Sequence, residues 1–99
     1  MADQFEGKAI GIFETDSLVA AMVALDQASK AAEITIQGVE RNRLKSGACV
    51  KMRGDISSIK AAMDVAIQTA SRYGNVTAHT TIASPDEGTE KAMKMTIGK

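Results

Sequence analysis

The sequence has few of the residues on which catalytic, metal and nucleic-acid sites usually depend. Its 99 residues include no Trp, one Tyr, two Phe, one His and one Cys. A single cysteine excludes an internal disulfide and a cysteine-based zinc cluster. One His and one Cys leave little material for a nucleophile–base pair, and few aromatic rings leave few platforms on which bases stack. From composition we expect no catalytic residues, no cofactor and no metal site.

An excess of charge of one sign and long apolar runs are also missing. Lys and Arg together number 12, as do Asp and Glu, so the formal net charge is zero. A balanced charge argues against a nucleic-acid partner. No apolar run approaches the ~20 residues that a transmembrane helix needs, and the first residues do not resemble a signal peptide. We expect one soluble, intracellular domain over residues 1–99, with no membrane partner.

The hydrophobic pattern predicts four strands and three helices. Alternating apolar residues predict strands over 8–14, 34–40, 48–53 and 76–82. Apolar residues at helical spacing predict long helices over 18–31 and 56–72, and a short last helix over 89–95. Because β-α-β crossovers are right-handed, both long helices should cover one face of the sheet and leave the other face exposed. The sequence therefore predicts an α+β, ferredoxin-like fold, a plan that serves many functions.

Four short motifs, in this order, resemble one known family. They are Glu14-Thr15, Leu18-Val19-Ala20-Ala21, Arg53-Gly54-Asp55 and Lys60-Ala61-Ala62. They are similar to the bacterial microcompartment shell domain (BMC domain) of the single-domain class, and the resemblance extends over about residues 8–95. The resemblance implies flat cyclic hexamers that tile the shell of an organelle in the cytoplasm. It also implies other shell proteins and encapsulated enzymes as partners, and a structural rather than enzymatic role.

The resemblance further implies that the loop after the second strand lines a pore on the sixfold axis. The loop consists of Arg41, Asn42, Arg43, Leu44, Lys45, Ser46 and Gly47. It is one residue longer than the common family loop, and we expect Lys45 or Ser46 near the narrowest point. Symmetry would gather about eighteen positive charges around one axis, offset in part by Glu40, and such a field attracts small anions. The alternative is an ordinary solvated hairpin loop.

A contact between neighbouring hexamers is also implied. The family's edge lysine corresponds to Lys30, in the last turn of the first long helix. Glu33 stands where an asparagine is common, and Ser84 stands where an arginine often supports the same contact. A lysine in the last turn of a helix also interacts favourably with the helix dipole. This interaction alone is sufficient to explain Lys30.

The sequence is compatible with two other functions. A ligand-sensing regulatory module of the ACT type has the same fold plan and binds a small metabolite at a dimer interface. A nucleic-acid binder would need exposed aromatic rings on the open sheet, and Phe13 is the only candidate on a central strand. Cys49 is expected as a small buried residue, and His79 as a structural or subunit-interface histidine.

Overall fold

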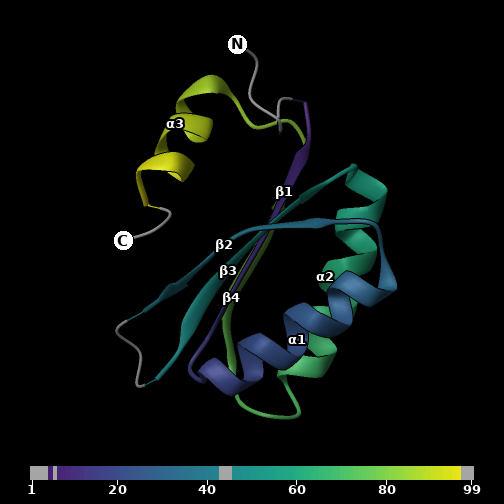
Figure 1. The fold of residues 1–99 in the computed structure, drawn as a ribbon, viewed down its shortest axis with the longest axis vertical. Helices are drawn as coiled ribbons and strands as arrows, with labels where there is room; N and C mark the ends of the chain where they lie inside the picture. Colours follow the sequence, from purple (N-terminus) through teal and green to yellow (C-terminus); the bar gives the residue numbers. More distant parts are fainter. Residues whose placement is uncertain (1–4, 6, 43–45, 97–99) are drawn as a thin grey trace.

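A computed structural model describes residues 5, 7–42 and 46–96 and confirms the predicted order of elements (Figure 1). The elements are β1 (Ala9–Thr15), α1 (Leu18–Ala31), β2 (Thr35–Arg41), β3 (Ala48–Gly54), α2 (Ile56–Ala70), β4 (Val76–Ile82) and α3 (Glu87–Thr96). The bounds of α1 and β4 match the prediction. The second helix ends two residues earlier than predicted and α3 begins two residues earlier. None of these described helices is long and apolar enough to cross a membrane.

The sheet has four strands in the order β2-β3-β1-β4, and every neighbouring pair is antiparallel. The central strands β1 and β3 pair along their whole length, from Ala9 opposite Gly54 to Thr15 opposite Ala48. Both long helices lie on the same face of the sheet (Figure 1). This is the predicted ferredoxin-like arrangement, in which each helix connects two strands that run in the same direction.

Local sequence explains where the long helices begin. Ser17 is the N-cap of α1, and its hydroxyl accepts a hydrogen bond of 3.2 Å from the backbone N–H of Ala20. Asp55 is the N-cap of α2, but its side chain makes no capping bond. Its carboxylate instead accepts a 3.0 Å bond from the Lys8 ammonium.

Small side chains let the helices pack closely on each other and on the sheet. The fully buried alanines of the two helices are Ala20, Ala21, Ala24, Ala28, Ala62, Ala66 and Ala70. At Gly11 in β1, an added Cβ would lie 3.0 Å from Cγ2 of Ile59 and 3.2 Å from Sδ of Met63. A Cβ contact of that length is tighter than ordinary packing allows, so α2 lies against β1 at the distance that glycine permits.

The other face of the sheet differs from the prediction, because α3 covers part of it (Figure 1). Two cations of β3 point to this face and are buried there: Arg53 is 1% exposed and Lys51 is 7% exposed. The Arg53 guanidinium donates to both carboxylate oxygens of Glu90 in α3, at 2.7 and 2.6 Å. The Lys51 ammonium pairs with Glu40 of β2 and donates to the hydroxyl of Thr96 at the end of α3.

Side chains, not backbone contact, hold α3 on the sheet. No Cα atom of α3 lies within 8 Å of a Cα atom of another described helix or strand. The gap is bridged by the long side chains of Lys51 and Arg53, and Met93 is the buried apolar residue of α3. Because charged groups are stable in a buried site only when paired and hydrogen-bonded, the docking of α3 depends on the Arg53–Glu90 ion pair and on the bond from Lys51 to Thr96.

Candidate functional site

The base of the loop between β2 and β3 is tied to the rest of the domain. The N–H of Asn42 donates to the carbonyl of Gly47 at 3.2 Å, which closes the hairpin. The carbonyl of Ser46 accepts a 2.6 Å bond from the N–H of Leu18 at the start of α1. Arg43, Leu44 and Lys45, which include one of the two positions expected near the narrowest point, lie outside the described residues.

Asn42 connects this loop to the end of β1. Its side-chain Nδ2 donates to Oε2 of Glu14 at 3.1 Å and to the carbonyl oxygen of Thr15 at 3.0 Å. Two hydrogen bonds from one amide fix the direction in which the chain leaves β2. This role of Asn42 is invisible in the sequence, because it depends on a contact between residues 28 positions apart.

The charges at the loop base differ from the expectation in one respect. Glu40, which was expected to offset part of the loop charge, pairs with the buried Lys51 on the face that α3 covers. Arg41 is exposed, and its Nε donates to the carbonyl of Gly47 at 3.4 Å. The loop sequence itself contains three cations, Arg41, Arg43 and Lys45.

The three expected edge residues are exposed. The Lys30 ammonium lies 2.8 Å from a carboxylate oxygen of Asp26, one helical turn earlier, and its side chain is 68% exposed. Such an exposed pair contributes only about 0.3–0.5 kcal/mol to stability, so Lys30 is available for other contacts. Glu33 follows α1, and Ser84 lies between β4 and α3.

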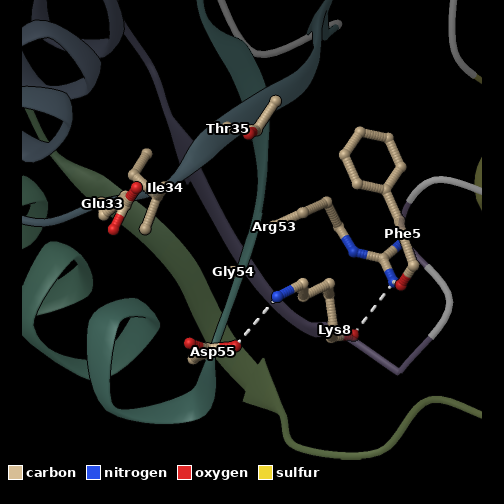
Figure 2. Close-up of a pocket in the computed structure, with 8 residues that line it drawn as sticks. All are labelled: Phe5, Lys8, Glu33, Ile34, Thr35, Arg53, Gly54 and Asp55. Atoms are coloured by element: carbon tan, nitrogen blue, oxygen red, sulfur yellow. Dashed lines mark hydrogen bonds and ion pairs between the residues drawn. The ribbon is translucent and has the colours of Figure 1, made fainter.

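Glu33 borders a cavity of about 330 Å³. Figure 2 shows the cavity between the start of β2 and the end of β3, where the Lys8 side chain points toward Asp55. The Arg53 side chain lies along its wall and donates to the backbone carbonyls of Phe5 and Lys8 at 3.1 and 3.0 Å. The Phe5 ring lies 5.1 Å from the guanidinium carbon, a cation–π contact that covers the ion pair.

The loop and the edge residues lie at opposite ends of the sheet. The strand register sets Arg41 opposite Ala48, at the end where β1 finishes. At the other end, Thr35 lies opposite Arg53, and β4 finishes beside Ile10. Figure 1 shows the end of β2 and the start of β3 at the lower left and the opposite end of the sheet at the upper right. The molecule measures 39 × 27 × 16 Å. The expected pore loop and the expected edge residues thus lie at opposite ends of it.

The remaining candidates are distributed as follows. Phe13 is fully buried under the helices, so it offers no ring on which a base could stack. His79 is exposed on β4. Cys49 is half-buried on the outer face, where burial and then the charge of Glu14 raise the pKa of its thiol. In the described part of the chain, no group of three His, Cys, Asp or Glu side chains is arranged to hold a metal ion.

Several curated proteins are similar in sequence to this chain. The shell protein PduK of Citrobacter freundii is 30% identical over 81 residues, which cover 82% of this chain and 52% of PduK. The shell protein PduA of Salmonella typhimurium is 34% identical over 93 residues, which cover 93% of this chain and 97% of PduA. The carboxysome shell protein CcmK2 of Synechococcus elongatus is 36% identical over 85 residues, 83% of this chain and 81% of CcmK2. The chain spans about half the length of the PduK relatives and nearly all of PduA.

A solved structure and a family model also match this chain. A crystal structure of a microcompartment protein from Desulfitobacterium hafniense matches 92% of this chain and 50% of its own chain, with a TM-score of 0.78 and 23% identity. The model of the BMC domain matches residues 9–85. That match includes the four motifs, both long helices and the whole four-stranded sheet. The chain belongs to the BMC domain family.

Proposed function

We propose that this chain is a structural shell protein of a bacterial microcompartment in the cytoplasm, and that it assembles as flat hexamers. The relatives are shell proteins of microcompartments and carboxysomes, which supports a role in the shell without catalysis. The ligand-sensing alternative of the ACT type receives no support from them. The observation that carries the hexamer proposal is the separation of the cationic loop from Lys30, Glu33 and Ser84 along the sheet. A ring needs one end of each subunit at its axis and the other at its rim.

In the ring we propose, the loop end faces the sixfold axis and lines a pore. The loop contributes Arg41, Arg43 and Lys45 from every subunit, and a ring of cations in a narrow opening concentrates anions. The pore therefore binds or passes small anionic metabolites. The partners of the ring are further copies of the chain, other shell proteins and the enclosed enzymes.

Replacing Arg43 and Lys45 with Ser is expected to lower anion binding to the assembled ring, because two of three loop cations per subunit disappear. Isothermal calorimetry with inorganic phosphate measures the effect. The matched control replaces two exposed lysines far from the loop, Lys60 and Lys91, with Ser. Unchanged phosphate binding in the loop variant, with the native mass unchanged, would remove the anion pore from the proposal.

Lys30→Asp is expected to abolish extended sheets while leaving single hexamers intact. The change reverses a charge at the rim and places a like charge one turn from Asp26, yet the fold loses only an exposed ion pair of about 0.3–0.5 kcal/mol. Electron microscopy of the assembled material distinguishes sheets from isolated rings. Lys60→Asp, the same change on the exposed back of α2, should still form sheets. Sheets formed equally by the Lys30 variant would contradict the role of Lys30 at the rim.

A further inference from the structure

The two sides of the domain differ in a way that suggests how neighbouring subunits meet, if the ring of the proposed function forms. With the loop end at the axis, the strands run outward from it, so the sides of each subunit are the edge strands β2 and β4. Helix α1 packs toward the β2 side, against β3, β1 and β2, and helix α2 packs toward the β4 side, chiefly against β1. A cyclic ring joins one side of a subunit to the other side of the next. The β2 side and the β4 side must therefore be complementary.

The β2 side carries an exposed cation near the axis. Arg41 is the last residue of β2, and Val39, two residues before it on the same face of the sheet, is 38% exposed. Apart from the bond from its Nε to Gly47, the guanidinium of Arg41 has no hydrogen-bond partner among the described residues. The β2 side thus offers a positive charge next to an apolar side chain.

The β4 side carries a hollow with a carboxylate. A cavity of about 290 Å³ opens on the sheet face that α3 leaves uncovered, and its lining residues are Ile12, Glu14, Cys49, Ala78, His79 and Thr80. Most of this lining is apolar, and β4 itself contains no Asp, Glu, Lys or Arg. Glu14 Oε1 accepts a 3.3 Å bond from the hydroxyl of Thr77, so the carboxylate reaches the β4 side near the loop.

Among the described carboxylates at the loop end of the sheet, Glu14 is the one that lines the cavity of about 290 Å³. The other carboxylate nearby, Asp16, accepts from the backbone N–H and the side-chain amide of Asn75 at 2.9 Å each. Among the described residues, the Asn42 amide donates to one oxygen of Glu14, and the Thr77 hydroxyl, which also lies 3.2 Å from the Glu14 carbonyl oxygen, is within reach of the other. A carboxylate oxygen has room for a second bond. A guanidinium can therefore add to Glu14 without displacing either partner.

Arg41 and Glu14 of the same chain do not meet. Arg41 lies opposite Ala48 and Glu14 lies opposite Cys49, so β3 runs between them and the two side chains leave opposite faces of the sheet. We propose that Arg41 of each subunit forms an ion pair with Glu14 of the next subunit. The partner is a second copy of this chain, selected by charge complementarity.

This pairing changes the proposed pore. Glu14 of the next subunit neutralises the charge of Arg41 at the subunit interface. The loop cations that can bind anions in the pore are then Arg43 and Lys45. The pair also links the base of the loop to the neighbour through Asn42, which holds the same Glu14. The same intersubunit ion pair thus both closes the ring and orients the loop.

A disulfide tests the pairing in the assembled protein. The variant replaces Arg41 and Glu14 with Cys, and Cys49 with Ser because it lies directly opposite position 14. Within one chain the two new cysteines are two strands apart, about 9–10 Å, beyond the roughly 7 Å that a disulfide spans. Oxidation should therefore link different chains, giving a ladder of up to six on a non-reducing gel.

The control carries Glu14→Cys and Cys49→Ser with Lys60→Cys, whose exposed cysteine lies on the back of α2, and it should give no such ladder. If the unmodified protein forms a ring of about 62 kDa but the 14–41 variant gives no ladder, the pairing is wrong and the proposed function stands. If the unmodified protein forms no ring, the proposed function fails first.

A second measurement avoids dependence on the cysteine variants. Arg41→Gln and Glu14→Gln each remove one charge of the pair, and Gln at position 14 still offers an oxygen to Asn42. Each single change should weaken ring assembly about fivefold, measured by dilution in light scattering, and the double change should weaken it little further. Additive effects of the two changes would overturn the pairing.

Discussion

Replacing Arg53 with Met is expected to lower the free energy of unfolding by about 3–5 kcal/mol, because it removes one partner from a buried ion pair. The Arg53 side chain is 0% exposed and Glu90 is 20% exposed, so the carboxylate left behind has little access to water. The backbone carbonyl of Lys8 and the side-chain oxygen of Gln37 lose their bond from Arg53 in the same variant, and the Phe5 carbonyl keeps only its 2.9 Å bond from the N–H of Lys8. Urea unfolding followed by circular dichroism measures the loss.

The Arg53 experiment has an internal control. Lys60→Met makes the same kind of change at an exposed helix position and should alter stability by no more than about 0.5 kcal/mol. Adding Glu90→Met to the Arg53 variant should recover part of the loss, because the orphaned carboxylate disappears. A single Arg53→Met variant within about 1 kcal/mol of the parent would contradict the view that this pair docks α3.

Gly47→Ala should open the base of the loop at an expected cost of about 1–3 kcal/mol, the range for forcing extra atoms into a packed site. A Cβ on Gly47 would overlap the backbone carbonyl oxygen of Thr15, and it would lie 2.7 Å from Oδ1 of Asn42 and 2.9 Å from Cα of Asp16. Two of these neighbours are backbone atoms, which cannot swing aside as a long side chain can. Thermal unfolding measures the effect.

Gly88→Ala is the matched control for Gly47→Ala. Its Cβ would lie 3.5 Å from Oδ1 of Asp86, an ordinary contact, and Ala favours a helix over Gly by about 0.8–1 kcal/mol. The two alanine substitutions should therefore change the melting temperature in opposite directions. Equal stabilisation by both would show that the loop base is not packed as described.

The elements were largely predictable because periodicity and capping residues are local signals. The bounds of α1 follow from Ser17 as an N-cap and from helical spacing of apolar residues, and β4 follows from alternation before Pro85. Gly74 predicted a helix end in its neighbourhood, and α2 ends four residues before it, at Ala70. Each of these signals lies within a few residues of the feature that it predicts.

The covered outer face was not predictable, because its signals are distant in sequence. Cys49, Lys51 and Arg53 alternate with apolar residues, a pattern typical of a strand with one face in water. The alternation predicts which face they take, but not that α3 closes over them. Glu90, which makes Arg53 tolerable in a buried site, is 37 residues away. The link from Asn42 to Glu14 is similarly a product of the fold and not of any local motif.

The most direct test of the account is the native mass, measured by light scattering on a size-exclusion column. The chain has a mass of 10.4 kDa, and a closed ring of six copies predicts a particle of about 62 kDa. That result would place the loops of six subunits around one axis. A stable monomer, or a dimer of about twice the chain mass, would contradict the account, because the ring of loop cations exists only by symmetry.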